Sequence, residues 1–192
     1  MKTLILLSGG YGAGKTTFAR KVCGNSNIVS LASPIRSILF KIIKDMRVLS
    51  SKQEDKDGLI DTSDLLIILK KDKVKGVNQK LFIKFISLLG EEDLGGVTVR
   101  RLLQLVGNAG RSLNKNYWIK EAFKLLDSLE GVNIGVDDVR YQNELNKLKD
   151  YGLKKGYNII HYFIGNADCL YDNQVLYKSA DYYLDWGLGV EW

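Results

Sequence analysis

The sequence contains few of the residues that define several large classes of protein. Its 192 residues include two cysteines, one histidine and one proline. Cys23 and Cys169 lie far apart and follow no ligand spacing, which argues against a disulfide scaffold or a cysteine-based metal site and predicts reduced thiols in the cytosol. The scarcity of proline, together with an aromatic content of 10%, also argues against disorder.

Long apolar runs are missing as well. The longest uninterrupted aliphatic run, residues 65–69, is far shorter than a membrane span. The apolar stretch of the opening "MKTLILL" is too short for a signal peptide, and glycines follow it in place of a cleavage site. We therefore expect a cytoplasmic protein (in the host cytoplasm if it is viral) with no membrane partner. Its net charge of +6 favours phosphates of a small ligand or nucleic acid as partners, although a lysine-covered solvated surface would give the same balance.

Apolar runs alternate with helical patterns along most of the chain. We expect strands at 2–8, 27–32, 132–138 and 157–164, and a short fifth strand within 181–186. Helices are predicted from Gly14 or Lys15 to about Val22, after a Ser33 cap, over 98–113 and 116–129, and over 142–152. This alternation predicts an α/β fold with a mostly parallel sheet covered by helices on both faces. Residues 1–49 and 98–192 would form the core, and residues 50–97 a helical insertion.

The first expected strand ends in the pattern Gly9-x-x-x-x-Gly14-Lys15-Thr16, which fits a phosphate-binding loop. Glycines allow backbone N–H groups to point at a phosphate, and the following helix adds the positive end of its dipole. Lys15 could reach the β- and γ-phosphates of ATP, and the Thr16 hydroxyl could hold Mg²⁺. The residues predicted to bind ATP are Gly9, Gly12, Ala13, Gly14, Lys15, Thr16 and Thr17.

Two acidic residues, Asp137 and Asp138, end the third expected strand, at the edge where α/β sheets place functional groups. A carboxylate of either residue could bind Mg²⁺ directly or through water; a loop aspartate that caps the next helix would look the same. Arg140, two residues further on, could neutralise a transferring phosphoryl group.

The pattern of residues 98–113 predicts one apolar and one polar helix face. Val99, Leu102, Leu103, Val106 and Leu113 would form the apolar face. Arg100 or Arg101, Gln104, Asn108 and Arg111 would form the other, which could bind a nucleotide or could simply be solvated. His161 is interpreted as a hydrogen-bonded core residue. The lysines at 70, 71, 73 and 75 are interpreted as a solvated helix end, with nucleic-acid contact as the less favoured reading.

Four segments together resemble the deoxynucleoside monophosphate kinases of tailed bacteriophages: "LLSGGYGAGKTT", "LASPIRSIL", "TVRRLLQLVGNAGRSLNKNYWIKEAF" and "GVDDVRYQNELNKLKDYG". The third and fourth segments are the specific ones, because phosphate loops occur in many families. The resemblance implies a P-loop kinase-type three-layer α/β/α fold and transfer of the ATP γ-phosphoryl group to a deoxynucleoside monophosphate (dNMP), with Mg²⁺. A homodimer is compatible with the sequence, which does not define an oligomeric state.

The resemblance also implies roles for individual residues. Arg36 follows the Ala-x-Pro turn and is expected near the acceptor, and Glu144 matches the acid that follows an Asp138-x-Arg140 pair. Arg100, Arg101, Gln104, Arg111 and Trp118 are assigned to acceptor binding. Lys15, Asp138, Arg140 and Arg101 are the expected catalytic residues, with Thr16 and Asp138 on the metal.

Two parts of the chain depart from this resemblance. Residues 50–97 show no likeness to the family, although they should hold much of the acceptor specificity, and the role of the segment from Asn166 stays open. Two other functions therefore remain: a P-loop kinase for another small acceptor or a polynucleotide end, and a non-enzymatic, nucleotide-gated DNA-binding module.

Overall fold

The structure, a computed structural model, describes residues 1–10, 12–50, 52–165 and 174–184. The chain divides into two units. Unit 1 consists of Met1–Leu31 and Ile119–Trp192, and unit 2 of Ala32–Trp118. The helical unit is thus larger than the insertion expected at 50–97, because residues 32–49 and 98–118 belong to it as well.

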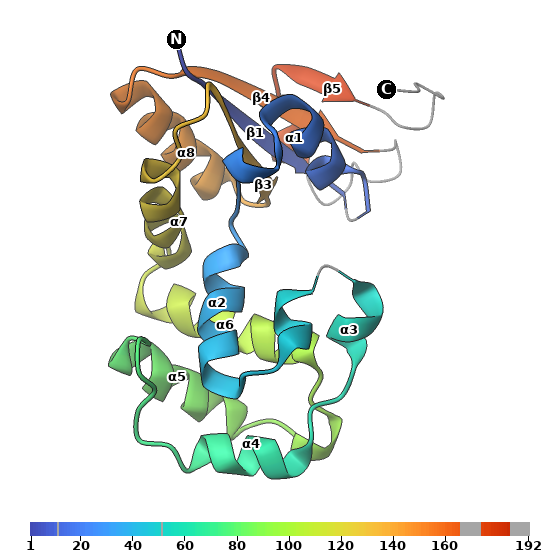
Figure 1. Cartoon of the computed structure of the whole chain (residues 1–192), viewed down its shortest axis with the longest axis vertical. Coiled ribbons are helices and arrows are strands. Elements are labelled where there is room, and N and C mark those ends of the chain that lie inside the picture. The colour runs from blue at the N-terminus through green and yellow to red at the C-terminus, as the bar shows by residue number, and fades with distance from the viewer. Residues whose placement is uncertain (11, 51, 166–173, 185–192) are drawn as a thin grey trace. The chain divides into compact units, whose positions relative to one another are not determined.

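Unit 1 is built on a parallel β-sheet (Figure 1). The strands of the described residues are β1 (Thr3–Gly9), β2 (Ile28–Ser30), β3 (Asn133–Val139), β4 (Asn158–Ile164) and β5 (Tyr182–Leu184). They pair in the order β2-β3-β1-β4-β5, and every pair is parallel. All five occur where the sequence predicted strands, although β1 and β3 each extend one residue beyond the expected end, to Gly9 and Val139. The central β1 has later strands on both sides, and in such sheets ligands bind beyond the carboxyl ends of the strands where the order reverses.

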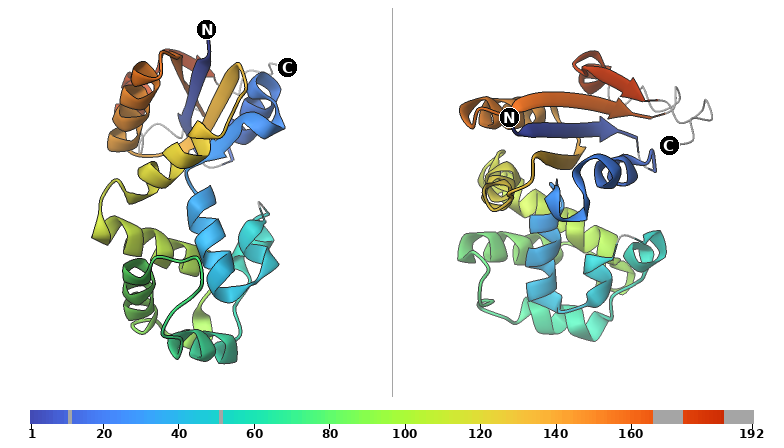
Figure 2. Two further views of the ribbon diagram at one scale, coloured as in Figure 1. Left: turned by 60° about the vertical axis from the view of Figure 1, so that its left-hand side comes forward. Right: turned by 45° about the horizontal axis from the view of Figure 1, so that its top comes forward.

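Helices cover both faces of this sheet, which is compatible with a three-layer α/β/α arrangement (Figure 2). Ile5 and Leu7 of β1 pack against Phe18 of α1 (Lys15–Cys23). Leu4 and Leu6 point to the opposite face, since side chains alternate along a strand. There they join a core with α7 (Tyr117–Asp127), α8 (Gln142–Lys154) and α9 (Gln174–Lys178). A short 3-10 helix, η1 (Asn25–Asn27), leads into β2.

Unit 2 is helical. It contains α2 (Ser33–Ile43), η2 (Met46–Leu49), α3 (Gln53–Asp57), α4 (Thr62–Leu69), α5 (Gln79–Leu89), η3 (Leu94–Gly96) and α6 (Val99–Leu113). The α6 helix packs against both α2 and α5. Leu39, Phe82, Phe85, Leu102 and Val106 contribute to one buried core, so the helices on both sides of residues 50–97 fold together with them.

Three details differ from the sequence-based expectation or add to it. Ala32, and not Ser33, precedes the first turn of α2, so that Ser33 is already helical. Leu113, expected on the apolar face of α6, is 42% exposed because it lies in the last turn of the helix. Cys23 is a buried free thiol whose pKa is raised to about 11 by burial, so it stays protonated at neutral pH. Cys169 lies outside the described residues.

Candidate functional site

The turn between β1 and α1 contains three glycines in backbone conformations that side chains rarely adopt. Gly9, Gly12 and Gly14 have φ angles of 129°, 72° and 83°. A Cβ atom on Gly9 would also lie 1.7 Å from the carbonyl oxygen of Ile164, so this position admits no side chain. The glycines allow the chain to turn tightly from a strand end into a helix N-terminus, a connection that favours binding of phosphate by backbone N–H groups.

Lys15, the first residue of α1, folds back over this turn. Its ammonium group donates hydrogen bonds to the carbonyl oxygens of Gly9 (3.0 Å) and Gly10 (2.7 Å). The first turn of α1 contains no acidic residue of its own, and the positive end of the helix dipole lies at this turn. A lysine charge and a helix N-terminus therefore meet at one short loop, which favours an anion. Ala13 packs on the core beneath the loop, and Thr17 is exposed on α1.

The next residue of α1 is connected to the neighbouring strand. The Thr16 hydroxyl donates a 2.8 Å hydrogen bond to Oδ2 of Asp137, whose side chain is buried near the carboxyl end of β3. Mg²⁺ prefers oxygen ligands and retains several waters, so one hydroxyl and one carboxylate beside the glycine turn form a suitable protein contribution. Thr16 and Asp137 therefore fit a magnesium site. The sequence analysis expected Asp138, and not Asp137, in this role.

An irregularity in β3 separates the two aspartates. Leu6 of β1 pairs with Val136 and Ser8 pairs with Val139, so that both aspartates lie opposite Leu7. Asp138 adopts a φ of 67°, an unusual value for a residue other than glycine. Such a bulge redirects the side chains beside it. Asp137 therefore contacts Thr16, and Asp138 is directed elsewhere.

Asp138 is paired with Arg140. The guanidinium donates from Nε to Oδ1 (2.9 Å) and from a terminal nitrogen to Oδ2 (2.7 Å), and these bonds raise the pKa of Arg140. This pairing corrects the assignment of Asp138 as the metal ligand, because its two oxygens already accept from Arg140. The Arg140 side chain is 65% exposed, so it stays accessible to an anion.

Glu144 has a structural role at the start of α8. Its Oε2 atom accepts hydrogen bonds from the backbone N–H groups of Arg140 (2.9 Å) and Tyr141 (3.1 Å), as the third residue of a helix does in a capping box. Burial raises the pKa of this carboxyl, and the two backbone bonds partly oppose that rise. Glu144 therefore fixes the backbone of Arg140. These hydrogen bonds account for the position of Glu144 without the contact with substrate that the resemblance implied.

In unit 2, α6 carries the polar face expected from the sequence. Arg101, Gln104, Asn108 and Arg111 are all exposed, and their spacing places them on one side of the helix. The positive charge of this face is partly neutralised. Arg101 forms a bidentate ion pair with Glu92 (2.8 and 2.6 Å), and the Arg111 guanidinium donates to Asn108 (2.8 Å).

The remaining arginines of unit 2 differ in their surroundings. Arg100 donates a 2.9 Å hydrogen bond to Asp57. Arg36, in the first turn of α2, is half-buried, and among the described residues its guanidinium has no ion pair or hydrogen-bond partner. A guanidinium that is not paired with a carboxylate is available to bind an anionic ligand. Arg36 is therefore the best acceptor-binding candidate of this unit.

Trp118 is part of the core and does not line a site. Its side chain is 5% exposed, its indole N–H donates to the carbonyl oxygen of Gly107 (2.9 Å), and its ring lies so close to Gly110 that a Cβ there would approach it to 2.5 Å. The assignment of Trp118 to acceptor binding is therefore wrong. Its conspicuous place in the sequence reflects packing onto the small residues of α6.

His161 is a core residue, as the sequence analysis expected. Its Nε2 lies 2.7 Å from the Ser8 hydroxyl and its Nδ1 lies 3.2 Å from the carbonyl oxygen of Ser179. Because the carbonyl can only accept, Nδ1 carries the proton and Ser8 donates to Nε2. Burial lowers the pKa of the ring, and the fully buried pair has no access to a substrate.

No protein-family model matches the chain, and no curated protein matches it. Among the described residues, no three or more His, Cys, Asp and Glu side chains gather as a metal-binding group. In that same part of the chain, no helix is long and apolar enough to cross a membrane. The functional assignment therefore depends on the residues themselves and on the resemblance given above.

Proposed function

We propose that this protein is a P-loop kinase that transfers the γ-phosphoryl group of ATP to a deoxynucleoside 5'-monophosphate in the cytoplasm, releasing ADP and a diphosphate. One observation carries the proposal. Lys15 covers a turn of left-handed glycines, and the next residue, Thr16, is hydrogen-bonded to the strand-end carboxylate of Asp137. A cation, a helix N-terminus and two oxygen-bearing side chains suited to Mg²⁺ thus lie together. These are the groups that a binding site for a nucleoside triphosphate and its magnesium ion needs.

The donor half of the proposal involves unit 1. The glycine turn and Lys15 would bind the β- and γ-phosphates, and Thr16 and Asp137 would hold Mg²⁺. When bound, Mg²⁺ would neutralise charge on the phosphate oxygens. For Lys15, a γ-phosphate would replace the loop carbonyls as the hydrogen-bond partner of its ammonium group.

The acceptor half involves residues of unit 2 and depends more on the resemblance. Arg36 would bind the acceptor phosphate, since its guanidinium has no carboxylate partner among the described residues. The exposed side of α6, with Arg101, Gln104 and Arg111, offers charges and amides for the rest of the nucleotide. The Glu92 carboxylate would have to release Arg101 before that arginine could bind a phosphate.

The reaction requires alignment and charge neutralisation more than proton transfer. An oxygen of the acceptor phosphate attacks the γ-phosphorus of ATP, and the bond from that phosphorus to the oxygen bridging to the β-phosphate breaks, so that ADP leaves. The acceptor oxygen is already deprotonated near neutral pH, because the second pKa of a phosphate monoester is about 6. No general base is therefore assigned, and Lys15 and Arg140 offset the charge that moves to the leaving group.

The experiment is a coupled assay of ADP release with each deoxynucleoside and ribonucleoside monophosphate in turn, and with a 5'-hydroxyl oligonucleotide as a further acceptor. We expect at least one dNMP to stimulate ADP release and the Lys15→Ala variant to lose this stimulation. Stimulation by the oligonucleotide alone would identify a polynucleotide kinase. If no acceptor stimulates turnover and the protein retains DNA in a salt-dependent manner, it is a binding module instead.

A further inference from the structure

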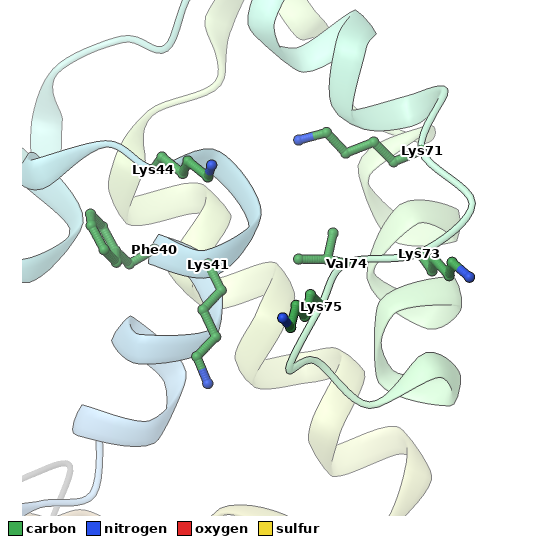
Figure 3. Close-up of a pocket in the computed structure, with 7 residues that line it drawn as sticks. All are labelled: Phe40, Lys41, Lys44, Lys71, Lys73, Val74 and Lys75. Atoms are coloured by element: carbon green, nitrogen blue, oxygen red, sulfur yellow. The ribbon is translucent and has the colours of Figure 1, made fainter.

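A pocket in unit 2 is lined almost entirely by lysines. It has a volume of about 470 Å³, and its wall consists of Phe40, Lys41, Lys44, Lys71, Lys73, Val74 and Lys75. Figure 3 shows Lys44 and Lys71 extending from opposite sides toward the space between α2 and the segment after α4, with Val74 also directed into it. The volume falls within the range of about 300–1,000 Å³ that is typical of small-molecule sites.

Two of the lysines join the walls of the pocket. Lys71 donates a hydrogen bond to the carbonyl oxygen of Ile42 (3.2 Å), and Lys41 donates to that of Gly76 (3.3 Å). These bonds connect the last turn of α2 with the segment that follows α4, in both directions. These two hydrogen bonds therefore help to fix the distance between the two walls of the pocket.

The five lysines of the pocket outnumber the carboxylates next to them in sequence, which are Asp45 and Asp72. Among the described residues, none of the five lysines forms an ion pair. The nearest acid in sequence to Lys44 is Asp45, which is committed to Arg47 through bonds of 2.6 to 3.1 Å. The negative end of the α2 dipole, equivalent to roughly half a charge, accounts for only part of this cluster. Like charges gathered without a counter-ion destabilise a fold, so a ligand that supplies the counter-charge is the natural explanation.

We propose that this pocket is a second nucleotide site, which binds a compact polyphosphate such as a nucleoside triphosphate. Three or four closely spaced negative charges match a cluster of ammonium groups better than one phosphate does. A concave site of this size fits a small anion, whereas a polynucleotide needs an extended charged track. Phe40 and Val74 give the wall an apolar part against which a base or ribose can pack. The pocket shares no residue with the glycine turn, so the proposal does not depend on the proposed kinase activity.

The test measures binding to the pocket alone. Isothermal titration calorimetry with tripolyphosphate and with ATP is carried out on the full chain carrying Lys15→Ala. Magnesium is left out, so that the proposed donor site does not contribute to binding. We expect saturable binding of one ligand per chain. Adding Lys44→Gln and Lys75→Gln should weaken it about tenfold or more, because two charge-assisted contacts are lost.

A control variant with the same loss of charge, Lys80→Gln with Lys154→Gln, changes exposed lysines outside the pocket. It should bind within about threefold of the Lys15→Ala parent. Circular dichroism establishes that each variant is folded. Tighter binding of ATP than of tripolyphosphate would indicate that the base or ribose is also recognised.

Three results would overturn the proposal. One is the absence of saturable binding of either ligand in the Lys15→Ala chain. Another is an equal loss of affinity in the pocket variant and the control variant, which would indicate an unspecific charge effect. The third is a preference for long oligonucleotides with a salt dependence that grows with their length, which would make this face a nucleic-acid surface.

Discussion

The Thr16 hydroxyl and the Asp137 carboxylate are 121 residues apart in the sequence and 2.8 Å apart in the structure. This hydrogen bond joins the first turn of α1 to the end of β3, and it distinguishes two adjacent aspartates that look alike in the sequence. Asp137 accepts from Thr16, and Asp138 accepts from Arg140. Of the two acids, we therefore propose Asp137 as the one that would share a magnesium ion with Thr16.

The two aspartates should therefore differ in their effect on catalysis. We expect Asp137→Asn to lower kcat by about 10²–10³-fold and to raise the Mg²⁺ concentration needed for half-maximal rate, because a charged metal ligand becomes neutral. Asp138→Asn should leave the magnesium dependence unchanged. Steady-state kinetics at varied Mg²⁺ measure both effects, and a larger shift in magnesium dependence for Asp138→Asn than for Asp137→Asn would reverse this assignment.

Arg36 should act on the acceptor and not on the donor. Arg36→Gln is expected to raise the KM for the monophosphate about tenfold or more, because a charge-assisted contact is replaced by a neutral one, and to leave the KM for ATP nearly unchanged. Trp118→Phe is the comparison in the same unit. It should lower the free energy of unfolding without changing the acceptor KM, since Trp118 is buried. An unchanged acceptor KM in Arg36→Gln would remove Arg36 from the site.

Two glycines of the β1–α1 turn allow a matched test of backbone geometry. Gly9→Ala should cost about 3 kcal/mol of stability or more, because the new Cβ would collide with the Ile164 backbone in addition to the strain of a positive φ. Gly12→Ala should cost only about 1 kcal/mol, since no atom lies within 4 Å of its Cβ position and only the positive φ is unfavourable. Urea denaturation measures both, and equal costs would contradict the described turn.

The buried Ser8–His161 pair predicts a pH dependence of stability. Burial holds the pKa of His161 below its ordinary value of 6.5, with a contribution of the same sign from Lys149 and opposing contributions from Ser179 and Asp181. Between the folded-state pKa and 6.5 the unfolded chain binds more protons than the folded chain, so stability falls as the pH drops through this window. Denaturation from pH 8 to pH 5 should show this loss relative to His161→Gln. Parallel curves for the two proteins would exclude His161 as the cause.

The order of elements could be predicted from the sequence, whereas several details of the site could not. Apolar runs such as Leu4 to Leu7 are buried on both faces of a sheet and therefore stand out from the amphipathic helices around them. The pairing of β1 with β3 depends on contacts between segments that are distant in the sequence, and such contacts cannot be predicted from a single sequence. The helical unit extends beyond the 50–97 insertion because α2 and α6 share a core with the inserted helices, and this too is a tertiary effect.

The roles of Asp137 and Asp138 could not be distinguished from the sequence either. Strict alternation along a strand directs successive side chains to opposite faces, but the bulge opposite Leu7 alters that relation. One sequence signal was available: Asp137 is the first acid after the apolar residues of the strand. Trp118 was misassigned for a different reason: the resemblance to the kinase family placed it near the acceptor, and the sequence did not reveal that its ring packs onto Gly110 of α6.

The central claim is that the glycine turn and Lys15 bind the polyphosphate of ATP. Calorimetric titration of MgATP into two proteins, the first with Lys15 and the second with Lys15→Ala, tests it most directly. The pocket lysines Lys44 and Lys75 are changed to glutamine in both proteins, so that a second nucleotide site does not contribute. We predict saturable binding of one MgATP by the first protein and a loss of about 10²-fold or more in affinity in the second. Equal affinity in the two proteins, or no binding in either, would contradict the account.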